Sequence, residues 1–299
     1  LLVSLLHLAR SIISCMSSTL ASVMTIRRSA GSMGSSPLFI RCARGAIHHI
    51  ATSPVPSTSL AVRSPSLLAK AISMRAMSSL VLRSDEKSTG ITTLTLNNPM
   101  KYNVLSWEML DTLQNQLDEI ATDSTIRVLV VGANGKAFSS GHDLKEIQSH
   151  QNIEDTTDLF KKCSKFMISI NKLPQPVIAK VQGVATAAGC QLVASCDLAI
   201  GSSAARFGVS GINLGLFCST PAVALSRTVQ RKQAMHMLLT GDLISAEEAL
   251  AYGLLNTVVS PDILESETTK LAEKIASKSS FGVQLGKKMF YDQLKYDNL

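Results

Sequence analysis

The stretch PQPVIAKVQGVATAAGCQLVASCDLAI, residues 174–200, decides the fold of this chain. It contains the mostly apolar run PVIAKV at 176–181, passes through a turn of small residues into a helical segment, and ends in the short run DLAI at 197–200. Short apolar runs bounded by turn residues are typical of strands buried on both faces of a parallel sheet. A strand, a crossover and a second strand predict a right-handed βαβ unit and an α/β fold.

The same alternation of strands and helices continues on both sides of this unit. Upstream we expect strands at 80–82, 91–96 and 126–131, and helices over about 105–120 and 155–171. Downstream the pattern is mostly helical, with helices expected over 222–229, 232–239, 246–252, 262–277 and 282–294.

Charge is distributed unevenly along the chain. The 299 residues contain 29 Lys and Arg against 22 Asp and Glu, a formal net charge of +7. Residues 1–84 hold nine basic residues and no acidic one, which leaves 20 basic and 22 acidic side chains in the remainder. The remainder is therefore slightly acidic, and the basic excess does not indicate nucleic-acid binding.

Residues 1–78 are rich in Ser, Ala, Pro and Arg and show no sustained hydrophobic period. This composition is typical of a mitochondrial transit peptide followed by a linker. We therefore predict a leader over 1–78, a folded domain over 79–299 and a location in the mitochondrial matrix. A disordered basic tail is the alternative for the leader. No apolar run is long enough to predict a membrane span.

The cysteines and histidines predict neither a disulfide framework nor a metal site. Six cysteines show no paired spacing, which favours reduced thiols and agrees with a matrix protein. The one histidine pair, His48 and His49, falls in the predicted leader. The absence of a G-x-G-x-x-G pattern argues against a dinucleotide cofactor.

Two strand-to-helix junctions are rich in small residues. They read KAFSSGHDLKEI at 136–147 and GVATAAGCQLVASCD at 183–197. Small residues let a backbone approach a ligand closely, and the first N–H groups of a helix point outward with the positive end of the helix dipole behind them. Two such junctions, if they converge, form a socket for a developing oxyanion. Ordinary tight packing is the alternative.

These junctions resemble the crotonase (enoyl-CoA hydratase) family. AFSSGHDLKE at 137–146 resembles the family's first loop, and residues 174–200 resemble its central strand and helix. NNPMKYNVLS at 97–106 is similar to its N-terminal asparagine–proline–asparagine turn. LLTGDLISAEEALAYGLLNTVV at 238–259 resembles its later helical pair, and NLGLFCSTPAVALSR at 213–227 is similar to a mitochondrial subgroup.

The resemblance covers about residues 80–299 and implies a repeated ββα core followed by C-terminal helices. The family continues beyond the position of Leu299 with helices that cover the active site and help to build trimers. The resemblance thus implies a truncated C-terminus here, and a homotrimer or a dimer of trimers for a complete chain.

The family holds the thioester oxygen of an acyl-CoA with two backbone N–H groups while that oxygen becomes an enolate oxygen. The resemblance places these groups at His142 and Ala188. One such donor contributes about 10²–10³ in rate in a known hydrolase. Ala188 replaces the usual glycine, but only its N–H is required. The implied partner is an acyl-CoA thioester, with coenzyme A as part of the ligand and no separate cofactor.

The family's two catalytic glutamates correspond here to Gln191 and Gly211. Hydration needs one carboxylate to activate water and another to deliver the α-proton, whereas Gln cannot take a proton near neutral pH and Gly has no side chain. Each general acid or base contributes typically about 10²–10⁴-fold. We therefore predict a mitochondrial acyl-CoA-binding protein linked to fatty-acid metabolism, with little or no hydratase activity.

Three other functions stay open. The triplet GHD at 141–143 resembles the loop of malonyl-type CoA decarboxylases, whose reaction needs an enolate-stabilising site more than a base. Weak hydratase or isomerase activity is the second, and a non-catalytic regulatory or partner subunit with a blocked pocket is the third.

Asp143 is better placed to cap the following helix than to do chemistry. Cys218 and Ser219 lie near the pocket in the resemblance, but the absence of a G-x-S-x-G elbow disfavours covalent catalysis.

For coenzyme A itself, the resemblance places Lys101 and Tyr102 near the phosphates and the pantetheine. It places Ala137, Ser139 and Ser140 around the adenine. A lysine beside a phosphate is physically sensible, although a solvated loop lysine is an equal alternative.

Overall fold

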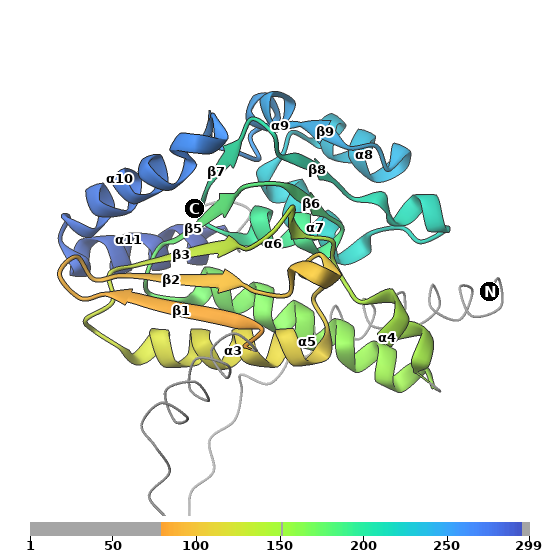
Figure 1. Cartoon of the computed structure of the whole chain (residues 1–299), viewed down its shortest axis with the longest axis horizontal. Coiled ribbons are helices and arrows are strands. Elements are labelled where there is room, and N and C mark those ends of the chain that lie inside the picture. Colours follow the sequence, from red (N-terminus) through yellow and green to blue (C-terminus); the bar gives the residue numbers. More distant parts are fainter. Residues whose placement is uncertain (1–78, 151, 295–299) are drawn as a thin grey trace, which may run out of the picture. The chain divides into compact units, whose positions relative to one another are not determined.

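The computed structural model describes residues 79–150 and 152–294 (Figure 1). The leader predicted over 1–78 lies outside the described residues. Among the helices of the described part, none combines the length and the apolar character that a membrane crossing requires.

A six-stranded sheet in the order β1-β2-β3-β5-β7-β10 forms the centre of the fold. Its strands are β1 (Val81–Glu86), β2 (Ile91–Leu96), β3 (Val128–Ala133), β5 (Val177–Val181), β7 (Leu198–Ser202) and β10 (Thr257–Val259). The β1 and β2 strands are antiparallel and every other pair is parallel. The four strands predicted between 91 and 200 are confirmed to within two residues at each start and end.

A second sheet lies beside the first, in the order β4-β6-β8-β9. It consists of β4 (Ala137–Ser139), β6 (Val184–Thr186), β8 (Arg206–Gly208) and β9 (Ile244–Ser245). The strands β4, β6 and β8 each follow directly on β3, β5 and β7, so the chain repeats a strand–strand–helix unit. This is the ββα core that the sequence resemblance implied.

The helices form layers on both faces of the main sheet (Figure 1). They are α3 (Trp107–Thr122), α4 (Leu144–Ser149), α5 (Ile153–Lys172), α6 (Ala188–Ser195), α7 (Ser219–Thr228), α8 (Arg231–Thr240), α9 (Ala246–Tyr252), α10 (Leu264–Ala276) and α11 (Ser280–Gln293). Three short 3₁₀ helices are η2 (Pro99–Lys101), η3 (Ser210–Leu214) and η4 (Pro261–Ile263). The helices predicted downstream of 222 are all confirmed.

The alternation of side chains along the strands sorts the core onto the two faces. On β3, Leu129 and Val131 pack toward the larger cluster that includes α3, α5 and α6. Val128 and Val130 pack on the opposite face against α10. Such a strand, apolar on both faces, is what a nearly continuous hydrophobic run predicts.

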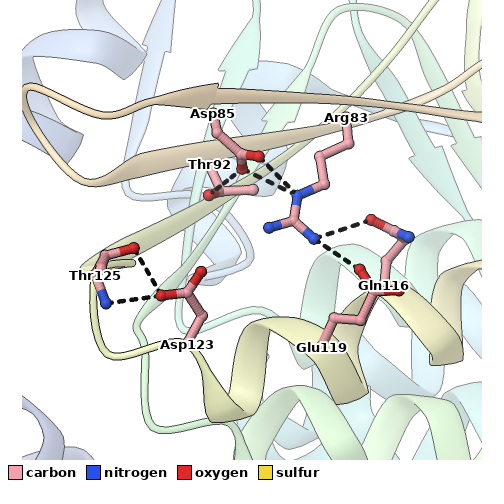
Figure 2. Close-up of polar contacts among 7 residues, drawn as sticks. All are labelled: Arg83, Asp85, Thr92, Gln116, Glu119, Asp123 and Thr125. Carbon is pink, nitrogen blue, oxygen red and sulfur yellow. Dashed lines mark hydrogen bonds and ion pairs between the residues drawn. The ribbon is translucent and has the colours of Figure 1, made fainter.

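A polar network fastens the edge strand β1 to α3 (Figure 2). The Arg83 guanidinium donates to Asp85 at 3.0 Å and to Glu119 at 3.0 Å, and Thr92 donates to the same aspartate at 2.8 Å. Several of these side chains are exposed, and exposed pairs contribute only about 0–1 kcal/mol. The charged side chains make β1 a poor template for pairing with another chain.

Candidate active site

The two small-residue junctions converge. Gly141 has φ +86°, and a Cβ placed on it would lie 3.1 Å from the amide nitrogen of Ala188 and 2.9 Å from the Cβ of Ala187. Only a glycine accommodates both this backbone angle and this close approach. The loop before α4 therefore lies directly against the N-terminus of α6, as the sequence analysis expected of an oxyanion socket.

The backbone at the start of α6 presents the Ala188 N–H outward. Ala188 is the first residue of α6, where the N–H has no partner within the helix. The unusual backbone falls one residue earlier, because Ala187 has φ 50° and ψ −120°. Such a conformation costs a non-glycine residue on the order of 1–3 kcal/mol. Ala188, where the resemblance implies a glycine, is not among the described residues with a positive φ.

The His142 ring is fixed and uncharged. Its Nδ1 lies 3.2 Å from the carbonyl oxygen of Leu105, and because a carbonyl only accepts, Nδ1 carries the hydrogen. The Nε2 atom is buried and has no hydrogen-bond partner in the described structure. Burial lowers the pKa of His142 to about 4. The imidazole is therefore neutral at physiological pH, while the Leu105 N–H donates to the carbonyl of Gly141 at 2.7 Å and ties the same loop down.

A cavity of about 900 Å³ opens over this socket. Its wall comes from the segments 100–104, 140–148, 187–188 and 210–221, together with Phe160 of α5. The His142 ring packs edge-on against Phe160, with ring centroids 5.0 Å apart. The wall is mostly apolar, and its volume is in the range of small-molecule sites.

Asp143 is the single carboxylate in the described part of this wall. Its side chain accepts hydrogen bonds from the N–H groups of Lys145 and Glu146, so it caps α4 as predicted. Its other oxygen lies 3.6 Å from the Lys101 ammonium. Both hydrogen bonds therefore go to one oxygen, and the other oxygen faces only an exposed ammonium.

Some of the predicted coenzyme A contacts lie in the cavity wall and others are buried outside it. Lys101, Tyr102 and Ser140 belong to the cavity wall. Ala137 and Ser139 do not, because both lie buried in β4 and the Ser139 hydroxyl accepts from the N–H of Gly141. The predicted placement of Ala137, Ser139 and Ser140 around the adenine stays a prediction, and for Ala137 and Ser139 it would have to involve their main chain.

Of the two predicted glutamate positions, one is buried outside the cavity wall and the other lies in the wall. Gln191 is 5% exposed, is not part of the wall, and has a side-chain oxygen that is buried without a partner in the described structure. Gly211 lies in the wall within η3. A Cβ at Gly211 would lie 2.6 Å from the Cys218 sulfur and 2.7 Å from the carbonyl oxygen of Leu216.

Sequence reasoning missed part of the wall. Phe160 reads as an ordinary apolar position of an amphipathic helix, so no sequence signal marks it as a cavity residue. Leu216 and Phe217 come from an irregular loop whose path a hydrophobic period does not predict.

No group of three or more His, Cys, Asp or Glu side chains within 79–150 and 152–294 is arranged to hold a metal ion.

Comparisons with known proteins agree with this geometry. The enoyl-CoA hydratase/isomerase family profile matches residues 86–299. The mitochondrial enoyl-CoA hydratase domain-containing protein 3 of Rattus norvegicus is 49% identical over 216 residues, covering 72% of each chain. The Homo sapiens protein of the same name is 50% identical over 208 residues, covering 70% of this chain and 69% of the relative.

Solved structures give the same result. An enoyl-CoA hydratase of Mycobacterium smegmatis superposes with a TM-score of 0.72 at 49% identity, covering 73% of this chain and 85% of the other. The human enoyl-CoA hydratase domain-containing protein 3 superposes with a TM-score of 0.71 at 48% identity, covering 73% and 86%. The mitochondrial names of the sequence relatives confirm the predicted mitochondrial localisation. By sequence and by fold, this chain belongs to the enoyl-CoA hydratase/isomerase, or crotonase, family.

Proposed function

We propose that the protein binds acyl-CoA thioesters in this cavity, holds the thioester oxygen with the N–H groups of His142 and Ala188, and does not hydrate enoyl-CoA. The observation that supports this best is the convergence of the two junctions on a cavity whose described wall contains one carboxylate, that of Asp143, which caps α4 with one of its oxygens. Two fixed donors stabilise negative charge on the carbonyl oxygen. Water activation needs a base as well.

No side chain described near the socket is suited to be that base. Gln191 lies beneath the wall and cannot accept a proton near neutral pH. His142 is neutral, but a group with a pKa of about 4 is a weak base at pH 7. The site is thus equipped to polarise a thioester and poorly equipped to hydrate one. A role in mitochondrial fatty-acid metabolism follows from this ligand class and from the localisation.

The rest of the proposed ligand follows the shape of the site. The apolar cavity accommodates an acyl chain and the pantetheine, and the exposed Lys101 ammonium at its mouth suits a phosphate. The open cavity favours ligand binding over a subunit with a blocked pocket. The homotrimer, or dimer of trimers, and the transit peptide over 1–78 belong to the same proposal and rest on the family resemblance and on the leader's composition.

Calorimetric titration of the full chain with saturated acyl-CoAs of increasing length tests the binding. Gly141→Ala should weaken butyryl-CoA binding at least about tenfold, since its Cβ would push against Ala187 and the Ala188 nitrogen. Gly253→Ala is the matched control, because Gly253 has φ +89° and lies outside the cavity wall. Equal weakening in both variants, or no binding by the wild type, would contradict the proposal.

The same observation favours decarboxylation as a second candidate. Loss of CO₂ from a malonyl-type thioester leaves an enolate, which the two N–H groups would stabilise without a general base. However, the neutral His142 ring offers no cation to the departing carboxylate. Release of CO₂ from malonyl-CoA or methylmalonyl-CoA by the wild type, lost in Gly141→Ala, would select this second function.

A further inference from the structure

The Cys218 thiol occupies the place of the side chain that position 211 lacks. Cys218 is the N-cap residue of α7 and belongs to the cavity wall. Its sulfur lies 2.6 Å from the point that a Cβ on Gly211 would take. Of the described atoms outside the immediate chain neighbours, this sulfur is the nearest to that point, followed by the Leu216 carbonyl oxygen at 2.7 Å. The chemistry available there is that of a thiol and not of a carboxylate.

Cys218 also lines the same cavity as His142 and Ala188, the residues of the proposed oxyanion socket. Ala188 opens α6, Cys218 precedes α7, and these two helices pack against each other. Cys190, in the first turn of α6, is near enough to Cys218 for the two thiols to interact electrostatically. The cavity wall thus combines the Ala188 N–H, which stabilises an enolate oxygen, with a sulfur that can form a bond to carbon.

We propose that Cys218 adds to α,β-unsaturated acyl-CoA thioesters held in this cavity and forms a covalent thioether with them. The inference rests on the proposed acyl-CoA site. In the step, the sulfur bonds to C3 of the enoyl group, and the π electrons of the C2=C3 bond move into an enolate held by the two N–H groups. The proton that leaves sulfur is delivered to C2. One S–H bond and one π bond break, one S–C and one C–H bond form, and no oxidant or second reactant is needed.

The surroundings of the sulfur make this reaction selective but slow. Burial raises the pKa of the Cys218 thiol, which keeps most of it protonated at neutral pH, while a hydrogen bond from the Gly211 backbone works in the opposite direction. Burial also raises the pKa of Cys163 and of Cys190 to about 12, and neither belongs to the cavity wall. We therefore expect a stoichiometric adduct rather than rapid turnover, because the thiolate is the attacking species.

Intact-protein mass spectrometry of the full chain with crotonyl-CoA tests the inference. The wild type should gain the mass of one complete crotonyl-CoA molecule. Peptide mapping over time should show that the adduct forms on Cys218 at least tenfold faster than on any other cysteine. Saturated butyryl-CoA should give no adduct. Cys218→Ala should abolish the gain and Cys196→Ala, which changes a cysteine outside the wall, should retain it.

Several results would overturn the inference. The absence of an adduct on the wild type would do so, and so would an adduct on another cysteine. A mass gain equal to the acyl group alone would also do so, because it indicates acyl transfer with loss of coenzyme A. Titration of Cys218→Ala with butyryl-CoA separates this failure from that of the binding proposal. Binding without any wild-type adduct refutes only the thiol chemistry, whereas loss of binding in wild type and variant alike refutes the acyl-CoA site.

Discussion

Gly211 and Cys218 share one small volume in the cavity wall, and this contact sets the cost of any side chain at position 211. The backbone of Gly211 does not lie in the left-handed region, so space rather than φ is the obstacle. Gly211→Ala should destabilise the protein by about 1–3 kcal/mol, the usual cost of overpacking. In a Cys218→Ala background the same change should cost clearly less, although the Leu216 carbonyl stays in place. Urea unfolding of the four proteins checks this, and equal costs in both backgrounds would disprove the contact.

Introducing glutamates at positions 191 and 211, the two predicted glutamate positions, extends that test to chemistry. The double variant Gln191→Glu, Gly211→Glu should remain inert toward crotonyl-CoA. Cys218 obstructs the carboxylate at position 211, and the carboxylate at position 191 is buried outside the cavity wall. Adding Cys218→Ala should yield measurable hydration, observed as loss of the enoyl absorbance, and each single glutamate variant in that background is a control. Effects of groups that act together are non-additive, so the singles should stay near zero. Hydration by the triple variant no faster than by the singles would mean that one position does not correspond to a family glutamate.

The His142 ring, which is half-buried in the cavity wall, predicts a particular dependence of stability on pH. Its pKa is about 4 in the folded protein against about 6.5 in the unfolded chain, so the unfolded chain binds the proton first as the pH falls. Stability should therefore decrease from pH 6.5 to pH 4, with a contribution from this residue of up to about 3 kcal/mol. His142→Phe should lose that part of the decrease. His236→Gln, at an exposed histidine, should keep it, and identical pH profiles for wild type and His142→Phe would refute the assignment.

At the scale of elements, α11 is fastened to the sheet by a buried ion pair. The Lys287 ammonium lies 2.6 Å from an oxygen of Asp197, and it also donates at 2.9 Å to the carbonyls of Ile170 and Gln175. The Tyr291 hydroxyl donates to the second Asp197 oxygen at 2.8 Å. Burial lowers the pKa of Lys287 in spite of its acidic partner.

Removing one partner of a buried pair leaves the other charge uncompensated. Lys287→Met should therefore destabilise the protein by about 3–5 kcal/mol in urea unfolding. The adjacent Lys288 is a matched control, since its ion pair with Asp292 is exposed and Lys288→Met should cost at most about 1 kcal/mol. Similar costs for the two variants would show that α11 is held mainly by apolar contacts.

The sequence predicts long elements well and short ones poorly. Strands such as β3 and helices such as α3 carry several apolar residues in register, so their periods are readable. The strands β4, β6, β8 and β9 have only two or three residues each, too few to show a period, and the second sheet was therefore not predicted. Its existence was implied only by the family resemblance.

Within the site, the sequence does not predict which residues line the cavity and which are buried outside it. The resemblance proposes His142 and Ala188 as the socket residues through their main-chain N–H groups, and this assignment stays a prediction. It did not indicate that Ala137, Ser139 and Gln191 lie beneath the wall, because burial depends on how the two sheets and α6 pack. The strain at Ala187 was equally invisible, since alanine is the wrong residue to signal a positive φ.

At the scale of the whole molecule, we predict that residues 1–78 direct import and that residues 79–299 form the ligand-binding domain. Residues 1–84 carry nine basic and no acidic side chains, and residues 16–84 fused to a reporter should direct it to mitochondria. The same fusion with Arg27 and Arg28 changed to Glu should be imported less, because the acid-free basic character is lost. A diffuse cytosolic signal from the unmodified fusion, seen by fluorescence microscopy, would contradict the transit-peptide prediction.

We propose that the site binds acyl-CoA and lacks the groups needed to hydrate it. The most direct measurement combines both properties in one sample of the full chain: butyryl-CoA titration by calorimetry, followed by crotonyl-CoA hydration by absorbance. We predict saturable binding near one site per chain, together with hydration at least about 10⁴-fold below that of an active family member, the combined loss expected for two general acid–base groups. Hydration at ordinary enzyme rates, about 1–10³ per second, would contradict the account.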